Sequence, residues 1–223
     1  ASAYRDNSSI GPSGVVPDYL KNQIIPGLHL QTIYHKNNLL LGAGYDFKRL
    51  NMRIETDSNI AVNEYVSSSA VHVFGKLELR KITIKAQCIW GENLYDQAML
   101  GGVGVTAIDS LTQTQSYAPI AQGSVWVNVT TKFPKFNFSL FTGYAKNLGS
   151  KTAFVGSKYA RGSDIAYIYR IAPQFSYKMG KIILFSETEY TVAAYGIANA
   201  YCNVSSAEEI ENLRQNLSIL FLF

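Results

Sequence analysis

The sequence predicts an all-β chain, an antiparallel sheet of about nine strands, and three observations support this prediction. From Gly27 onward, segments of about ten residues alternate apolar and polar side chains and are separated by turns. Apolar residues make up 47% of the 223 positions and aromatic residues 13%, whereas only 16% are charged. Helical periodicity is nearly absent: only the polar run 205–211 could begin a helical turn, and it lies in a predicted connection.

Nine segments show this alternation and are the predicted strands: 27–35, 39–49, 71–79, 82–91, 124–133, 136–145, 165–177, 181–193 and 213–223. A β-strand crosses a bilayer with about 9–11 residues, which these segments match. The connections alternate between short (36–38, 80–81, 134–135, 178–180) and long (50–70, 92–123, 146–164, 194–212). Barrels of the outer membrane have short periplasmic turns and longer extracellular loops, so the short connections are expected on the periplasmic side.

Each segment has one apolar and one polar face, and the position of its aromatic residues indicates what the apolar face meets. They gather near the segment ends, where they form two rings around an apolar band: Tyr34, Trp90, Phe133, Phe136, Tyr144, Tyr177 and Phe223. Aromatic girdles of this kind mark membrane interfaces. The pattern therefore favours a transmembrane β-barrel in a lipid bilayer over a soluble β fold, in which the apolar face turns inward.

Composition excludes several other classes of protein. Two cysteines are too few for a disulfide scaffold or a cysteine-rich zinc module. The longest apolar runs contain five residues, whereas a membrane-spanning helix needs about 20. The net charge of +4 comes without a long Lys/Arg block, which is a poor basis for binding nucleic acid. We expect no nucleic-acid partner, no metal and no cofactor.

The chain divides into residues 1–26 and the strand region 27–223. Residues 1–26 contain Gly11-Pro12-Ser13-Gly14, Pro17 and Pro26, which predict an extracellular loop or the remnant of a preceding strand. Nine strands is an odd number, and the first would run toward the periplasm, so we expect further strands before Ala1 and read the chain as the C-terminal part of a larger barrel. The alternative is one further strand within 1–10, which would give ten.

The polar face supplies the candidate pore-lining residues: Lys48, Lys76, Glu78, Arg80, Lys85, Lys132, Arg170, Glu187, Glu189 and Arg214. With Asp46 included, seven basic residues stand against four acidic ones. Lys and Arg in a water-filled pore favour anions. We therefore expect a weak preference for anions, small anionic or neutral solutes such as carboxylates as cargo, and the largest contribution from Lys76, Lys85 and Arg170 near mid-barrel.

The connection 92–123 is the longest, and it contains the apolar stretch 100–105. Long connections of this kind usually have a function. We predict that it folds inward and narrows the lumen, with Asp96 and Asp109 as its charged members. The alternative is a short β-hairpin that extends the barrel above the membrane.

An enzyme is not expected, although three histidines and paired carboxylates prompt the question. His29, His35 and His72 fall on the polar face but are predicted to be scattered, with His72 near the outer rim and His35 at a periplasmic turn. Acid–base catalysis needs partners within hydrogen-bond reach. Glu187 and Glu189 share a face simply because residues two apart on a strand do so. A receptor or adhesin acting through its loops is the other alternative; the connection 50–70 is instead rich in Ser and Asn.

Four stretches resemble the C-terminal half of Gram-negative outer-membrane porins of the DcaP-like type: 141–149, 169–177, 187–196 and the terminal Leu220-Phe221-Leu222-Phe223. The resemblance extends over most of 27–223. It implies a sixteen-stranded diffusion channel, often a homotrimer, whose N-terminal strands are missing from this chain. The terminal Phe223 resembles the signal that the barrel-assembly machinery reads.

Overall fold

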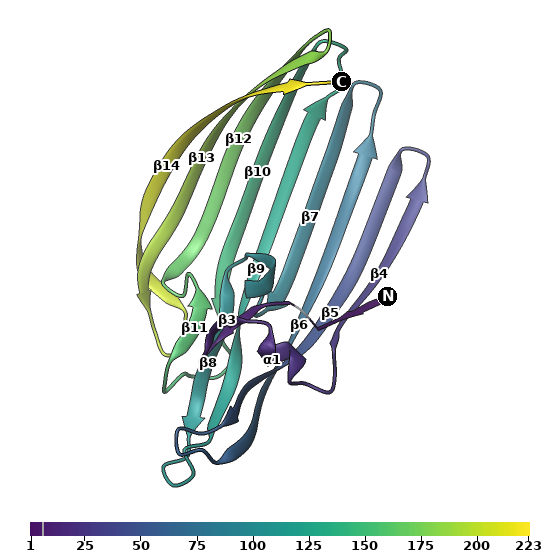
Figure 1. Ribbon diagram of the computed structural model, residues 1–223. Helices are drawn as coiled ribbons and strands as arrows, with labels where there is room; N and C mark the ends of the chain where they lie inside the picture. Colours follow the sequence, from purple (N-terminus) through teal and green to yellow (C-terminus); the bar gives the residue numbers. More distant parts are fainter. Residues whose placement is uncertain (6) are drawn as a thin grey trace.

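The computed structural model describes residues 1–5 and 7–223, and one long antiparallel sheet dominates it (Figure 1). The nine predicted strands are confirmed: β4 (Gly27–Lys36), β5 (Leu39–Glu55), β6 (Ala61–Glu78), β7 (Ile82–Glu92), β9 (Gln115–Thr131), β10 (Phe136–Gly149), β12 (Ile165–Met179), β13 (Ile182–Ala198) and β14 (Val204–Phe221). Each pairs with the next in this order. The short strand β1 (Ser2–Tyr4) pairs with the start of β4 at the other end of the sheet.

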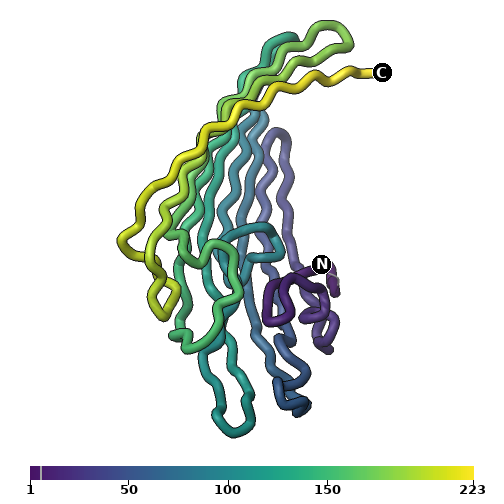
Figure 2. The backbone as a smooth tube through the Cα atoms, turned by 60° about the vertical axis from the view of Figure 1, so that its left-hand side comes forward, coloured from purple at the N-terminus to yellow at the C-terminus, as the bar shows by residue number. Residues whose placement is uncertain are grey.

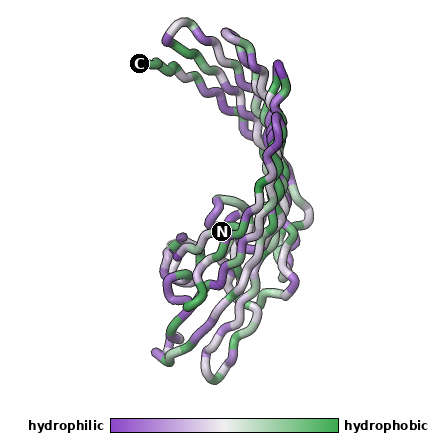
Figure 3. Tube along the Cα trace, turned by 90° about the vertical axis from the view of Figure 1, so that its right-hand side faces the viewer, coloured by the Kyte–Doolittle hydropathy of each residue, from purple (hydrophilic) through white to green (hydrophobic). Residues whose placement is uncertain are grey.

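The sheet is strongly curved along its strands and forms a trough (Figures 2 and 3). Within the described residues, the path of paired strands runs from β1 to β14 and no pairing joins these two ends. The short turns and the C-terminus lie at the end drawn uppermost in Figure 1. Among the described residues, no helix is long and apolar enough to cross a bilayer.

The strands are longer than predicted at the end opposite the short turns. The expected connection 50–70 shrinks to residues 56–60, because β5 and β6 keep pairing as far as Glu55 and Ala61. Residues 205–211, which were expected in the connection 194–212, belong to β14 and form no helical turn. In β5, Leu50, Met52 and Ile54 still alternate with polar residues as far as Glu55. In 205–211, polar side chains lie on both faces, and the strand continues through its backbone pairing.

The connection 92–123 divides into two parts. Its first part contains the single turn η1 (Tyr95–Gln97), and its second contains β8 (Gly101–Ile108), which forms a hairpin with β9 and also pairs with β11 (Lys158–Arg161). Gly102 is required where β8 meets β11, because a Cβ there would lie 2.1 Å from the carbonyl oxygen of Tyr159. The 92–123 connection therefore combines a turn that folds back onto the sheet with a hairpin that prolongs it.

Within residues 1–5 and 7–26 the structure has three short strands and one helical turn: β1, β2 (Ser9–Gly11), β3 (Gly14–Val16) and α1 (Asp18–Lys21). Tyr19 and Leu20 of α1 are buried against Leu50 and Met52 of β5. Figure 3 shows this segment inside the curve of the sheet. The segment, which we name the N-terminal insert (residues 1–26), thus covers part of the concave face.

Candidate functional site

The strand side chains predicted to line a pore face the concave side of the sheet. Because side chains alternate along a strand, Asp46, Lys48, Leu50 and Met52 of β5 share one face. Leu50 and Met52 pack against the N-terminal insert, which lies on the concave side (Figure 3). The face that carries Asp46 and Lys48, and the residues aligned with them across the other strands, is therefore the concave one.

The opposite, convex face is apolar and exposed. Exposed side chains on it range from 37% for Phe138 to 77% for Leu217. Others of this kind are Leu28, Leu30, Leu41, Tyr45, Val71, Val73, Val125, Ile171, Phe175 and Ile219. Monomeric soluble proteins rarely expose a contiguous apolar surface of this extent. One buried cluster lies on the concave side beneath the N-terminal insert, and two smaller ones lie around Leu94 and Phe154.

Two of the three histidines meet on the concave face, so the expected scatter is wrong for them. His29 Nδ1 lies 2.8 Å from Asp46 Oδ1, and His72 Nδ1 lies 3.5 Å from Asp46 Oδ2. The two imidazole rings stack with their centroids 5.6 Å apart. Register explains this: His29 is opposite Asp46, and His72 is opposite Gly44, whose missing side chain leaves room for the ring.

The two-residue turn at 37–38 is the sequence feature from which the contact between His29 and Asp46 could have been predicted. A tight turn fixes which residues of a hairpin face each other, and here it places His29 opposite Asp46. His35 lies away from this cluster, opposite Leu40. Besides the Asp46 carboxylate, an amide contacts the cluster: His72 Nε2 lies 3.5 Å from Gln31 Oε1. Within the described part of the chain, no group of His, Cys, Asp or Glu is arranged to hold a metal ion.

The turn η1 and the N-terminal insert meet the sheet beside this cluster. Lys48 Nζ donates to Asp96 Oδ1 at 2.5 Å, and both side chains are less than 10% exposed. Asn7 Nδ2 of the insert donates to Asp96 Oδ2 at 3.1 Å. Burial, with Asp96 and Asp46 nearby, raises the pKa of Tyr4 to about 12. Asp109, the other acidic residue considered for a constriction, lies instead at the exposed tip of the β8–β9 hairpin, where two backbone N–H groups bind its carboxylate.

Nearer the short turns, the concave face carries lysines on adjacent strands. Lys76 of β6 is directly opposite Lys85 of β7. Glu78 contacts Lys76 and lies 3.5 Å from Lys132, which follows the end of β9. Arg80 lies in the exposed turn between β6 and β7, outside both strands. Lys85 has no carboxylate partner within residues 1–5 and 7–223.

A second charged group lies across β12, β13 and β14. Glu189 Oε2 is 3.1 Å from Arg170 Nη1 and 3.0 Å from Arg214 Nη2. Glu187, two residues earlier on β13, accepts a bond from Asn216 Nδ2 at 3.4 Å. The Glu189 carboxylate therefore bridges two guanidinium groups from the strands on either side. The predicted pore-lining residues thus do not form one continuous row of charges across the sheet.

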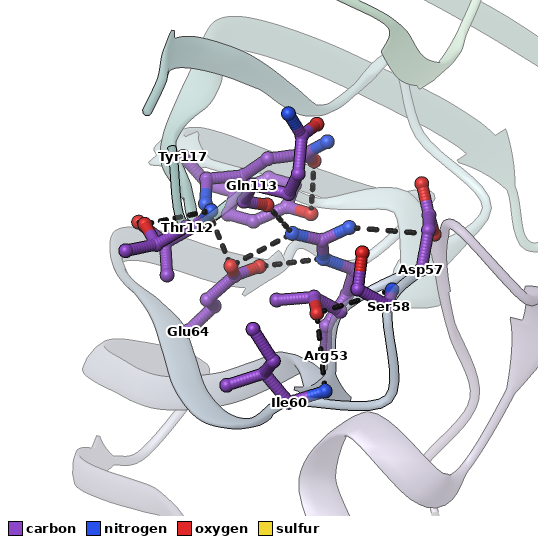
Figure 4. Close-up of polar contacts among 11 residues, drawn as sticks. Arg53, Asp57, Ser58, Ile60, Glu64, Thr112, Gln113 and Tyr117 are labelled. Atoms are coloured by element: carbon purple, nitrogen blue, oxygen red, sulfur yellow. Dashed lines mark hydrogen bonds and ion pairs between the residues drawn. The ribbon is translucent and has the colours of Figure 1, made fainter. Parts of the chain in front are cut away.

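Beyond the predicted strands, an ion pair fastens two hairpins together (Figure 4). Arg53 of β5 forms two hydrogen bonds with Glu64 of β6, at 2.7 and 2.8 Å. Arg53 also donates to the Gln113 carbonyl at 2.6 Å, and Glu64 accepts the backbone N–H of Gln115. The bidentate bond to Glu64 raises the pKa of Arg53 further above its usual range. The β5–β6 hairpin is thereby joined to the β8–β9 hairpin.

Six of the seven aromatic residues predicted for the membrane interfaces lie at or near strand ends, and Tyr144 lies inside β10. Phe136 begins β10 and stacks on Tyr177 of β12 at a centroid distance of 4.6 Å. Tyr144 stacks on Tyr167 at 5.8 Å. The remaining four are exposed: Tyr34, Trp90, Phe133 and Phe223.

Comparison with solved structures identifies the architecture. The fold is similar to that of the outer membrane channel DcaP of Acinetobacter baumannii, with a TM-score of 0.62 and 13% identity over 90% of this chain and 52% of that chain. Weaker similarities link it to the outer-membrane expressed OmpT of Vibrio cholerae (TM-score 0.49, 13% identity, 87% and 54% covered) and to the NanC porin (0.38, 11%, 89% and 93%). No protein-family model and no curated protein matches the chain.

The expected likeness to DcaP-type channels is thus confirmed at the level of the fold, and the chain spans about half the length of that channel. The chain has the antiparallel β architecture of an outer-membrane porin wall.

Proposed function

We propose that this chain forms part of the wall of a diffusion channel in the outer membrane of a Gram-negative bacterium. The channel passes small hydrophilic solutes, with a weak preference for anionic over cationic ones. The strands 27–223 cross the bilayer, the N-terminal insert narrows the lumen from within, and the hairpins beyond the apolar band point to the cell exterior.

The observation that carries the proposal is the division of the sheet into an exposed apolar face and a polar face that carries ion pairs. An exposed apolar surface of this size suits a lipid environment, and a charged concave face suits a water-filled lumen. The porin-type fold supports the same conclusion. A closed barrel needs partners for the edges of the sheet, and the resemblance to DcaP-like porins offers them as further strands in a sixteen-stranded, trimeric assembly. The exposed Phe223 suits recognition by the barrel-assembly machinery.

The charge of the concave face supports the anion preference. The predicted set has seven basic and four acidic residues. Asp96 of η1 pairs with Lys48, and Arg80 lies in a turn outside the strands, which leaves six basic residues against five acidic ones. Of these six, Lys85 alone has no acidic partner among the described residues. Salt screens such charges beyond about 8 Å, so a modest preference is expected rather than strict selectivity.

Reversal potentials across a KCl gradient test this function. The full-length protein in a planar bilayer should favour Cl⁻, and replacement of Lys76, Lys85 and Arg170 by Gln should move the reversal potential toward the cation side. Lys146→Gln is the matched control, because Lys146 is an exposed lysine on the opposite face of β10. A cation preference in the wild-type channel, or no shift in the triple variant, contradicts the anion preference; absence of any channel contradicts the function.

A further inference from the structure

A groove of about 260 Å³ in the concave face lies between the His29–Asp46–His72 cluster and the short turns. Six of the side chains that line it are Gln31, Phe74, Lys76, Lys85, Gln87 and Trp126, and we name it the lysine groove. Register places five of these residues in two adjacent rows across the sheet, and Gln31 lies in the next row with His72, which also lines the groove. Phe74, Gln87 and Trp126 form one row, and Lys76 and Lys85 form the next.

The lysine row carries an uncompensated charge. Lys76 and Lys85 are direct cross-strand partners, an arrangement that destabilises a sheet because like charges repel. Glu78 contacts Lys76 and Lys132 but not Lys85, and among the described residues Lys85 has no carboxylate partner. An anion placed between the two ammonium groups would relieve this repulsion and bind both of them.

The aromatic row carries an apolar surface inside an otherwise polar wall. The Phe74 ring lies over Gly42, where a Cβ would be 2.2 Å from it, so the ring is folded against the backbone of the neighbouring strand. The indole N–H of Trp126 donates to Gln87 Oε1 at 3.1 Å. This bond occupies the carbonyl oxygen of the Gln87 amide and orients its NH₂ group, which has no partner among the described residues.

We propose that the lysine groove binds a monocarboxylated pyranose, a sugar acid of the hexuronate type. Its carboxylate lies between Lys76 and Lys85, the C–H face of its ring lies on the aromatic row, and its hydroxyl groups bond to the Gln87 and Gln31 amides. The proposal deepens the proposed channel function and rests on it for the route by which the solute arrives. The groove holds one such ring, and its amides favour a hydroxylated ring over a hydrocarbon one, which would leave them desolvated.

Intrinsic fluorescence measures this binding without requiring conduction. The chain has two tryptophans, so Trp90→Phe, a change on the convex face, leaves Trp126 in the groove as the one reporter within these residues. The emission of the Trp90→Phe/Trp126→Phe variant is subtracted to remove any other contribution. We expect glucuronate, added to this variant of the full-length protein in detergent, to change Trp126 emission saturably. Gluconate, which has the charge but no ring, and glucose, which has the ring but no charge, should each bind more weakly.

Two further substitutions in the Trp90→Phe background locate the site. Lys85→Gln should weaken glucuronate binding about tenfold, because one charge-assisted hydrogen bond is lost. Lys81→Gln, which removes the same charge from the adjacent exposed turn, should leave it unchanged. Equal effects of both variants, equal binding of gluconate, or tighter binding of benzoate than of glucuronate would each overturn the proposal. Saturable binding without any channel current upholds the groove and contradicts the channel function, and a current without binding does the reverse.

Discussion

Lys48 and Asp96 form a buried ion pair at the point where η1 meets the sheet. Both side chains are less than 10% exposed, and Asn7 of the N-terminal insert binds the same carboxylate. Taking two charges out of water is costly, and a single charge left behind costs more than the pair. The pair therefore fixes where η1 and the insert lie on β5 more than it adds to stability.

Removing one member of the pair should destabilise the protein more than removing both. We expect Asp96→Asn to lower the free energy of unfolding by about 3 kcal/mol, because it leaves the Lys48 ammonium buried without a counter-charge. The double variant Lys48→Met/Asp96→Leu should stay within about 1 kcal/mol of the wild type. Urea unfolding in detergent measures both, with Asp57→Asn as the control, since the Asp57 side chain is 90% exposed. A double variant no more stable than Asp96→Asn would contradict this account.

Tyr4 gives the insert a dependence on alkaline pH. Burial raises its pKa to about 12, so the folded state favours the neutral phenol more than the unfolded chain does. Its contribution to stability is complete below pH 10 and is lost as the pH rises from 10 to about 12. Subtracting the tyrosinate absorbance titration of Tyr4→Phe from that of the wild type should leave a single step near pH 12. A step near pH 10 would show that Tyr4 is not buried in solution.

At the scale of elements, strands could be predicted from the sequence where apolar and polar side chains alternate. They could not be predicted where only backbone pairing continues the strand. Phe138 and Leu217 predicted their strands because every second residue is apolar. The outer part of β5 keeps this signal, because Leu50, Met52 and Ile54 alternate with polar residues as far as Glu55. Residues 205–211 of β14 have no such signal, and the strand continues there only through its hydrogen bonds. The position of η1 depends on the contact between Lys48 and Asp96, which joins residues 48 positions apart and has no local sequence signal.

The N-terminal insert should restrict the passage that the concave face encloses. Leu20 is 1% exposed and packs on β5, so Leu20→Asp places a carboxylate in an apolar contact and should release the insert. Single-channel conductance of this variant is expected to rise. Leu111→Asp is the matched control, because Leu111 is 92% exposed at the tip of the β8–β9 hairpin. Unchanged conductance in Leu20→Asp, with heat-modifiable gel migration retained, would place the insert outside the conducting path.

For the whole molecule, the exposed convex face predicts how the protein behaves on extraction. An apolar surface that spans every long strand requires lipid or detergent, so we expect the full-length protein to be released from membranes by detergent and not by plain buffer. Because its strands are joined by an extended ladder of backbone hydrogen bonds, the protein should stay folded in dodecyl sulfate at room temperature and unfold on boiling. Unboiled samples should then migrate differently on a gel from boiled ones. A protein that stays soluble in plain buffer would contradict the membrane location.

The bidentate bond between Arg53 and Glu64 has a consequence for what the protein presents to its surroundings. The same two side chains also bind Gln113 and Gln115, which joins the β5–β6 and β8–β9 hairpins into one rim. The loop 109–114 extends beyond this rim as a short tip, the lowest point in Figure 1. The hydrogen bonds of that tip are largely internal, as the contacts of Asp109 with Leu111 and Thr112 illustrate. With the outward orientation proposed for these hairpins, antibodies or phages would meet the tips first. Substitutions confined to 109–114 would change the protein's antigenic identity and leave the solutes it admits unaltered.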